Sequence, residues 1–359
     1  MPNATLTRAI DALASRRDLS ADETADVLNE IMHGEVSETQ IAGFLIALRT
    51  KGETVDELAG LARTMRELAA HVPTKRDDLL DTAGTGGGQR TFNVSTTAAL
   101  IAAGAGCAVA KHGNRSATSA SGSADLLEAL GARIDLDPQA VARCIEEAGF
   151  GFMFAPAHHQ ATRFVVPVRR ELAVRTIFNL LGPLTNPAGA RRQVIGVSDA
   201  SFLDTIAGAL ARLGVDRALV VAAEDGLDEL SIVTATKVVE VNGDELERYT
   251  LAPGDVGIEP VDAEVLQRDC AGGTPEHNAA VTRAIFDGDG DGDGAASASA
   301  STQLAVINAG AAIYAAGAAD SIADGVQAAL AALSDGRAAQ ALDRYVRASR
   351  SLAPSRAAL

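Results

Sequence analysis

The chain has 359 residues, a length that suggests roughly two domains and allows a substantial buried core. Hydrophobic residues make up 47% of it and charged residues 22%, a balance typical of globular proteins rather than disordered chains. The net charge of −16 repels nucleic acid and anionic membranes, so partners of those two kinds are not expected. Few lysines beside many aspartates suggest a halophilic-type acidic surface, with an ordinary acidic protein as the alternative.

The three cysteines, Cys107, Cys144 and Cys270, form no Cys-x-x-Cys pair and are odd in number. This pattern argues against a disulfide framework and against a zinc site. Residues 1–7 show no signal-peptide pattern, and the apolar stretch 98–110 is too short to cross a bilayer. We therefore expect a cytoplasmic protein.

The first seventy residues read as consecutive short helices. Three capping-box patterns mark expected helix starts, at Ser20–Glu23, Ser37–Gln40 and Thr54–Glu57. Gly34 and Gly52 stand where two of these helices would end. Residues 1–73 are predicted to form a small all-helical domain.

From Asp78 onward the pattern alternates between strands and helices. Strands are expected at 79–82, 107–110, 133–136, 151–154, 192–197 and 218–223, and a hairpin at 237–251. Helices are expected at 95–103, 138–148, 202–213 and 302–333. The alternation predicts a large α/β domain over 74–359 with a mostly parallel central sheet. Residues 165–190 are expected to return to the helical domain.

An acidic low-complexity segment spans residues 287–301. Its Asp-x-Asp-x-Asp-Gly spacing resembles the start of an EF-hand, but Ala298 stands where the bidentate glutamate would be required. A solvated acidic surface loop is the better interpretation.

Three neighbouring segments have the chemistry of anion binding. The glycine turn 84–88 follows an expected strand and frees backbone N–H groups, although a plain tight connection is equally compatible with it. Gln89 excludes a dinucleotide fingerprint, and no Gly-Lys-Ser/Thr follows to make a P-loop. The second segment, 93–97, begins a helix with spare hydroxyl groups, which would also serve simple capping by Ser95 or Thr96.

The third segment, Lys111-His112-Gly113-Asn114-Arg115-Ser116, adds positive charge and leads through a hydroxyl-rich run into another helix start. Together the three segments suggest a ligand with more than one phosphate. His112 could act as a general base or pack in the loop, and we favour packing or substrate positioning. His158 and His159 suit a pocket wall better than a metal site.

Two further features lie later in the chain. Arg169 could bind a carboxylate through its planar guanidinium, with Arg170 and Arg175 as rivals. The pair Asp228-Glu229 follows a buried strand, where ligand sites of such sheets lie, and paired carboxylates suit Mg²⁺. Solvated charge on an acidic loop is the competing interpretation of this pair.

With these motifs and the run Asn179-Leu-Leu-Gly-Pro-Leu-Thr-Asn-Pro187, the chain resembles the anthranilate phosphoribosyltransferases of tryptophan biosynthesis over nearly its whole length. The resemblance implies a small helical domain with a larger α/β domain, usually in a homodimer. It also implies transfer of the phosphoribosyl group of 5-phospho-α-D-ribose 1-diphosphate (PRPP) to anthranilate, with Mg²⁺ as cofactor and diphosphate as the second product.

The resemblance further implies a set of site residues, none of them a general base. Residues expected to bind PRPP are Gly84, Gly87, Gly88, Thr91, Asn93, Val94, Ser95, Thr96, Lys111, His112, Gly113, Asn114, Arg115, Ser116, Ala117, Thr118, Ser119 and Ser123. Those expected to contact anthranilate are Gly84, Asn114 and Arg169. Ser95, Asp228 and Glu229 are expected to ligate magnesium.

One position departs from the family pattern. The family's turn usually reads GTGGD, whereas Gly88 replaces the aspartate here and the spacing to Thr91 is one residue shorter. The usual acidic contact is therefore missing, and Gln89 could replace part of it.

Two alternatives remain open. A pyrimidine-nucleoside phosphorylase shares the architecture but uses phosphate and a nucleoside, and the sequence around His112 and the 179–187 run favour the transferase. A non-catalytic nucleic-acid-binding relative is disfavoured by the charge of −16 and by the Asp228-Glu229 pair.

Overall fold

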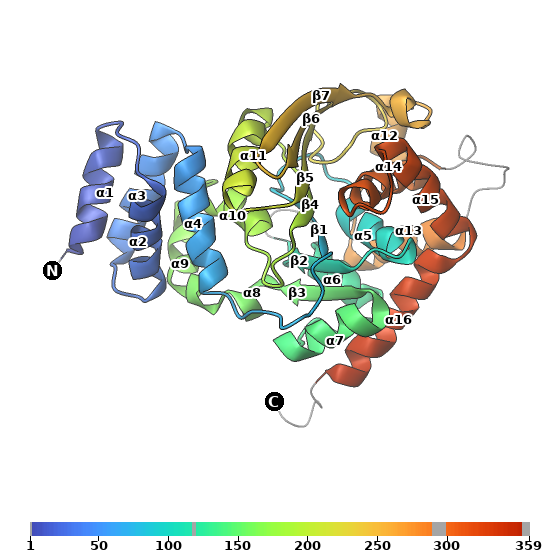
Figure 1. Cartoon of the computed structure of the whole chain (residues 1–359), viewed down its shortest axis with the longest axis horizontal. Coiled ribbons are helices and arrows are strands. Elements are labelled where there is room, and N and C mark those ends of the chain that lie inside the picture. The colour runs from blue at the N-terminus through green and yellow to red at the C-terminus, as the bar shows by residue number, and fades with distance from the viewer. Residues whose placement is uncertain (1, 117–119, 289–298, 354–359) are drawn as a thin grey trace.

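The computed structural model describes residues 2–116, 120–288 and 299–353 of the chain. A helical bundle lies at one end of the molecule, a central sheet follows, and the C-terminal helices cover the far side of that sheet (Figure 1). The predicted fold class, a small helical part with a larger α/β part, is confirmed.

The bundle consists of α1 (Ala4–Ala14), α2 (Ala21–Met32), α3 (Glu38–Lys51) and α4 (Val55–Glu67). The capping boxes at Ser20 and Thr54 form as expected. The Ser37 hydroxyl accepts the Gln40 amide, but the Gln40 side chain donates to Asn3 and Thr7 of α1 instead of closing the box. Two later helices, α9 (Val166–Leu172) and α10 (Phe178–Leu184), share the apolar core of the bundle.

The sheet has seven strands in the order β3-β2-β1-β4-β5-β6-β7. The first five are parallel, and β6 and β7 are added as an antiparallel hairpin. The strands are β1 (Leu80–Gly84), β2 (Val109–Gly113), β3 (Phe150–Phe154), β4 (Arg192–Gly196), β5 (Arg217–Ala223), β6 (Thr236–Asn242) and β7 (Glu245–Leu251).

Alternate residues of the sheet face two different cores, as the two-residue period of a strand requires. Leu219 and Val221 of β5 belong to the core with the C-terminal helices, whereas Ala218 and Val220 belong to the core of the helical bundle. The first core is built with α5 (Val94–Gly104), α7 (Pro138–Ala148), α14 (Ala300–Ala315), α15 (Ile322–Ser334) and α16 (Arg337–Leu352). On the other face α11 (Leu203–Arg212) packs between sheet and bundle.

Short elements complete the fold at the strand ends and on the surface. They are α6 (Ser123–Ala129), α8 (Ala155–His158), α12 (Ala263–Asp269) and α13 (Pro275–Asp287), with 3-10 turns η1 (Gln160–Phe164), η2 (Ala200–Phe202) and η3 (Pro253–Val256).

One predicted strand, one predicted helix and one predicted helix cap need correction. Residues 133–136 form no strand, because Arg133 pairs with Asp135 and its amide donates to Ser349 of α16 while the apolar side chains between are buried. The helix predicted over 302–333 is two helices, α14 and α15, separated by a turn in which Gly317 has φ +74°. The N-cap of α5 is Asn93, so neither Ser95 nor Thr96 caps this helix.

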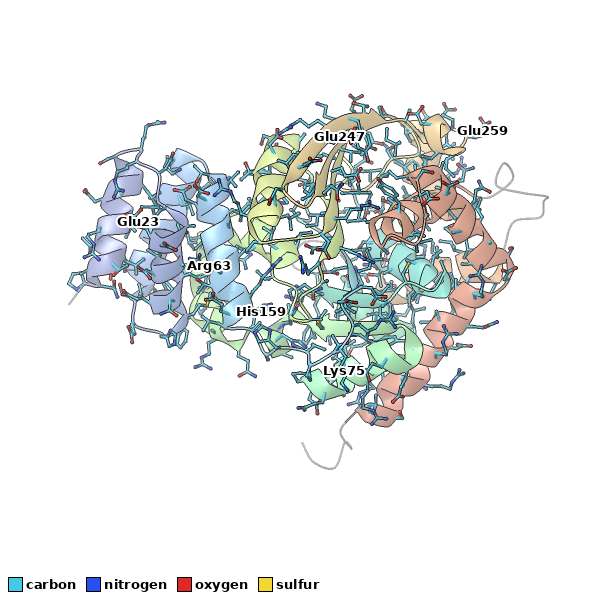
Figure 2. The ribbon with its side chains drawn as sticks, viewed as in Figure 1. Glu23, Arg63, Lys75, His159, Glu247 and Glu259 are labelled. Atoms are coloured by element: carbon cyan, nitrogen blue, oxygen red, sulfur yellow. The ribbon has the colours of Figure 1, made fainter. Side chains whose placement is uncertain are left out.

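The surface carries acidic side chains, among them the exposed Glu23, Glu247 and Glu259, which come from separate parts of the chain (Figure 2). Within the described ranges no helix is long and apolar enough to cross a membrane. Most of the predicted acidic loop 287–301 lies outside the described residues, which omit 289–298.

Candidate active site at the carboxyl ends of the parallel strands

The predicted site segments converge where the sheet changes direction. From β1 the chain continues to β2 and β3 on one side and later returns to β4 on the other. In open α/β sheets, ligands bind beyond the carboxyl ends of the strands at such a switch point. The glycine turn follows β1, the Lys111 segment forms the end of β2, and Asp228-Glu229 follows β5.

The glycine turn is held from outside by Arg175. The guanidinium of Arg175 donates to the carbonyl oxygens of Gly86, at 2.7 Å, and Thr85, at 3.2 Å. Ser198 also donates to the Gly86 carbonyl, at 3.0 Å. A Cβ at Gly87 would lie 2.0 Å from the Arg175 guanidinium, so this contact requires a glycine. Arg175 therefore lies against the turn.

The turn also encloses the carboxylate of Asp228. A Cβ on Gly84 would lie 3.0 Å from one Asp228 oxygen, and a Cβ on Gly88 only 2.3 Å from the other. The amide of Gly86 hydrogen-bonds to the same carboxylate. The position where the family usually has an aspartate thus leaves no room for any side chain here, because Asp228 fills that space.

Lys111 lies at the base of the site, and its side chain is almost completely buried at 1% exposure. Its ammonium donates to the carbonyl and hydroxyl oxygens of Thr82 and to the Ser95 hydroxyl, 3.4 Å away. The Ser95 amide, in the first turn of α5, donates to the carboxylate of Glu229. Lys111, Ser95 and Glu229 are therefore brought together from three different elements.

The two carboxylates beyond β5 fit a hard divalent cation. Burial raises the pKa of Glu229 to about 8, with the nearby Asp228 charge adding to the shift, and burial also raises the pKa of Asp228. Neither carboxylate forms an ion pair with any described residue. No group of three or more His, Cys, Asp or Glu side chains suited to a metal occurs in the described ranges. Mg²⁺ needs no larger set, since it keeps waters and substrate oxygens as ligands.

The helix-start residues divide between the site and the core. Asn93 is held by its side chain, which bonds to Ser121 and Asn278. Val94 is buried, and the Thr96 hydroxyl is buried with no hydrogen-bond partner among the described residues. Thr91 forms an isolated bridge with Ala271 behind the turn.

In the rest of the Lys111 segment, Arg115 is already paired. Its guanidinium contacts the carboxylates of Asp125 and Glu128 and lies over the Phe154 ring at 5.7 Å. The Ser116 amide donates to Asp125 as well.

The other predicted residues of this segment lie before and after Arg115 in the sequence. Asn114 is exposed, Gly113 packs under Phe152, and Ser123 is the first residue of α6. Ala117, Thr118 and Ser119 lie outside the described residues.

The histidines form a buried cluster. The His112 and His159 ring centroids are 5.0 Å apart; His112 hydrogen-bonds to the Gly182 carbonyl, and His159 to that of Thr185. Figure 2 shows His159 between the helical bundle and the sheet. Burial lowers the pKa of His112 to about 3 and that of His159 to about 4, so both stay neutral at pH 7. This geometry favours packing over general-base chemistry.

Arg169 is half-buried on α9, with its guanidinium 5.5 Å from the centre of the Phe178 ring. It forms no ion pair with the part of the chain that the structure describes, and burial lowers its pKa. Arg170 is exposed, and Arg175 is bound to the glycine turn. Of the three rival arginines, Arg169 is thus the half-buried one that remains available for a carboxylate.

Sequence reasoning missed three residues that shape this site: Asp81 and Thr82 on β1, and Asn186 in the loop after α10. Asp81 and Asn186 are buried and hydrogen-bonded to each other at 2.8 Å, although 105 positions separate them. The only sequence signal was their polarity inside otherwise apolar runs.

The comparisons with known proteins cover both parts of the chain. Residues 76–339 match the model described as "Glycosyl transferase family, a/b domain", and residues 7–69 match "Glycosyl transferase family, helical bundle domain". The anthranilate phosphoribosyltransferase of Rubrobacter xylanophilus is 50% identical over 97% of this chain and 98% of its own. That of Methanopyrus kandleri is also 50% identical, over 92% of this chain and 96% of its own.

Solved structures agree with these matches. The anthranilate phosphoribosyltransferase of Thermus thermophilus superimposes with a TM-score of 0.87 at 45% identity, covering 95% of this chain and 99% of that one. The Saccharomyces cerevisiae enzyme, solved in complex with PRPP and Mg, gives a TM-score of 0.86 at 27% identity over 98% and 99% of the two chains. The family predicted from the sequence is confirmed: this chain belongs to the anthranilate phosphoribosyltransferases.

Proposed function

We propose that this chain transfers the phosphoribosyl group of PRPP to the amine of anthranilate in tryptophan biosynthesis. The products are N-(5-phosphoribosyl)anthranilate and diphosphate. The observation that carries the proposal is the meeting of Lys111, Ser95 and Glu229 beside the glycine turn, at the switch point of the sheet. This arrangement brings a cation, helix-end donors and a metal-binding pair together at the carboxyl ends of the strands.

The donor side takes the diphosphate. Lys111 supplies positive charge, the first turn of α5 supplies backbone amides and the Ser95 hydroxyl, and the glycine turn lets an anion approach the backbone. The remaining PRPP ligands are those implied by the family: the 84–96 segment and the 112–123 segment. Arg115 takes part only by exchanging one of its two carboxylate partners for a phosphate.

The acceptor side takes anthranilate. Arg169 binds its carboxylate, since the guanidinium is half-buried and no described carboxylate pairs with it. Gly84, at the end of β1, and Asn114, just beyond β2, border the same space from the sheet. The neutral histidine pair supplies an uncharged wall for an aromatic ring.

Mg²⁺ is the cofactor, held by Asp228, Glu229 and the Ser95 hydroxyl. When bound, it would neutralise charge on the diphosphate and on the two carboxylates, neither of which forms an ion pair with a described residue. Burial raises the pKa of both carboxylates, and the Asp228 charge adds to the shift of Glu229, so a bound cation would stabilise their ionised forms.

The chemical step is a displacement at the C1 carbon of the ribose. The C1–O bond to diphosphate breaks with its electron pair on the oxygen, the anthranilate nitrogen forms the new bond, and that nitrogen then releases one proton to the departing diphosphate or to water. Lys111 and the N-terminus of α5 stabilise the charge that develops on the departing group. An aromatic amine is uncharged at neutral pH, so alignment of two bound substrates provides most of the remaining acceleration without a strong base.

The experiment follows the loss of anthranilate fluorescence in the presence of PRPP and Mg²⁺. Fluorescence should fall only when the protein, PRPP and Mg²⁺ are all present. Phosphorolysis of a pyrimidine nucleoside with no use of anthranilate would instead support the phosphorylase alternative, and binding of nucleic acid without turnover would support the non-catalytic one.

We further propose that the chain divides into two domains at residues 73/74, with residues 165–190 returning to the helical domain. We also propose a homodimer formed through that helical domain. Among the described residues, the exposed large hydrophobic side chains are Ile46, Val166 and Val174, and all three lie within residues 1–73 or 165–190. Light scattering after size exclusion should give twice the mass of the chain, and an Ile46→Glu, Val166→Glu double variant should give the monomer mass.

We propose that the protein lies in the reducing cytoplasm, a location that agrees with the state of its cysteines. All three are free and buried, and burial raises the pKa of Cys107 to about 11. Localisation of a tagged chain tests this point.

A further inference from the structure

The end of α10 and the loop after it have no assigned role in the reaction, although they carry the most distinctive run of the sequence. Their backbone carbonyls bind side chains of separate elements: Gly182 accepts from His112, Pro183 from Gln193, Leu184 from Arg66 and Thr185 from His159. A helix end leaves its last carbonyls unpaired, and here each has a partner from elsewhere in the fold.

Strands β1 and β2 separate beside this loop. They are in register only at Leu80 and Val109, where the Leu80 amide donates to the Ala108 carbonyl at 2.8 Å. In a regular parallel pair the next bonds would join the Thr82 amide to the Ala110 carbonyl and the His112 amide to the Thr82 carbonyl. By contrast, β1 and β4 stay paired along all five residues of β1.

Side chains take over these missing bonds. The Asn186 amide donates at 2.8 Å both to the Ala110 carbonyl and to the Asp81 carboxylate. The other Asp81 oxygen accepts the His112 amide at 3.1 Å. The freed Thr82 carbonyl accepts the ammonium of Lys111 instead. The Thr82 amide in turn bonds to the Asp81 carboxylate. The gap between the strands is thus a built feature in which each separated backbone group named here has a replacement partner.

We infer that Asp81 and Asn186 are positioning residues that hold β1 and β2 apart and thereby place the Lys111 ammonium between Thr82 and Ser95 at the donor side of the site. The inference rests on the proposed function, because it assigns the pair a part in binding PRPP. Both side chains are buried, at 0% and 3% exposure, and their polar atoms already bond to each other and to the backbone of β2. Their effect on the reaction passes through Lys111.

The test compares Asn186→Ala and Asp81→Asn with wild type in steady-state kinetics and in calorimetric titration with PRPP and Mg²⁺ without anthranilate. We expect the KM and the dissociation constant for PRPP to rise at least about tenfold, the size of one lost charge-assisted contact. The KM for anthranilate should stay within about twofold, as Arg169 belongs to another element and none of its contacts change.

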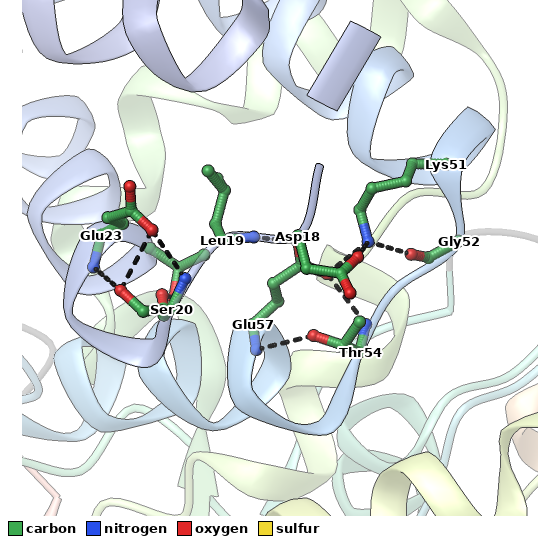
Figure 3. A network of polar contacts seen from close by, with 9 residues as sticks. Asp18, Leu19, Ser20, Glu23, Lys51, Gly52, Thr54 and Glu57 are labelled. Carbon is green, nitrogen blue, oxygen red and sulfur yellow. Dashed lines mark hydrogen bonds and ion pairs between the residues drawn. The ribbon is translucent and has the colours of Figure 1, made fainter. Parts of the chain in front are cut away.

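A matched control is Glu57→Gln in the helical bundle. Glu57 is also a fully buried carboxylate, and it accepts the Leu19 amide at 3.0 Å and pairs with Lys51 (Figure 3). It is far from the site in the fold, so this variant should lower the melting temperature without changing the KM for PRPP.

The inference is overturned if Asn186→Ala and Asp81→Asn lower the melting temperature like the control while both constants for PRPP stay at the wild-type values. If Asn186→Ala does not fold, Asp81→Asn decides, because it keeps the shape and the oxygen that accepts the His112 amide. A wild-type protein that binds PRPP without turnover refutes the proposed function only, since calorimetry still measures the effect of the pair.

Discussion

Lys111 is almost completely buried, so water screens a charge on it little, and in the proposed site it would interact with a phosphate more strongly than a surface lysine. Burial lowers its pKa, while Asp81 and Glu229 oppose that shift. Arg115, by contrast, is 48% exposed and already paired with two carboxylates. At the scale of single residues, charge on the donor side therefore comes chiefly from Lys111.

Lys111→Ala should reduce kcat/KM about 100-fold or more, mainly because the charge on the departing diphosphate is stabilised less.

Arg169→Ala should instead raise the KM for anthranilate about 10- to 100-fold, because a charge-assisted contact to its carboxylate is lost. Steady-state kinetics with each substrate varied distinguish the two patterns. The exposed Lys237→Ala is the control, and wild-type constants for either site variant would exclude its assigned role.

Substitution of Gly88 tests whether the space that Asp228 fills is required. Gly88→Asp restores the residue usual in the family. We nevertheless expect it to lower activity about tenfold or more, because the new Cβ would overlap an Asp228 oxygen and the new carboxylate would lie beside a group of the same charge. Gly88→Ala should also lower activity, because its Cβ would meet the same Asp228 oxygen. Gly254→Ala, at a position where a Cβ meets nothing within 4 Å, should behave as wild type. Activity of Gly88→Asp above wild type would contradict this account.

The buried histidines predict how stability depends on pH. The folded-state pKa values of His112 and His159, about 3 and about 4, lie below the ordinary value, so the unfolded chain binds more protons between these pH values and about 6.5. Stability should thus be highest above pH 6.5 and fall as the pH drops towards 4. Thermal unfolding at several pH values measures this, and His112→Gln should show a weaker dependence between pH 6.5 and 4.

Residue types with unusual chemistry for their place could be predicted from the sequence, and relations between distant residues could not. Lys111, Ser95 and the Asp228-Glu229 pair stood out because charge and hydroxyl groups followed apolar strands. Arg169 and Arg175 could not be told apart, since their roles depend on the path of the chain between α9 and α10. Asp81 and Asn186 became visible only once the fold paired them.

At the scale of elements, the glycine turn is tied to the helical bundle through one arginine. The side chain of Arg175 binds the turn, while its own carbonyl accepts the guanidinium of Arg49 on α3 at 2.6 Å. A hydrogen-bond network therefore runs from α3 of the bundle to the glycine turn.

Arg175→Met should weaken PRPP binding by about tenfold, because two charge-assisted bonds to the turn are lost and its backbone can rearrange. Arg170→Met, which changes an exposed arginine of the same stretch, should have little effect. Titration calorimetry with PRPP and Mg²⁺ measures both. Equal affinities of the two variants would show that the turn keeps its shape without Arg175.

Most elements were predictable because their periodicity and caps are local properties of the sequence. The failures came from tertiary contacts. Residues 133–136 have the alternation of a strand, but they pack beside α16 and never reach the sheet. Helices α14 and α15 read as one alanine-rich helix, yet they fold back on each other, with Gly310 and Gly325 in close contact.

At the scale of the whole molecule, the charge of −16 creates self-repulsion that dissolved salt screens. Raising potassium chloride from 0.1 to 2 M should raise the melting temperature by several degrees. Sucrose of equal osmolality is the control for exclusion of solute from the surface. A melting temperature that rises no more in salt than in sucrose would contradict adaptation of this surface to salt.

The central claim is that one cleft joins anthranilate to the ribose of PRPP with loss of diphosphate. The most direct measurement counts both products of a single reaction mixture, by mass spectrometry for N-(5-phosphoribosyl)anthranilate and by a coupled assay for diphosphate. We expect equal amounts of the two products, and none when anthranilate, PRPP or Mg²⁺ is omitted. Diphosphate released without anthranilate, or anthranilate left unchanged while PRPP is consumed, would contradict the account.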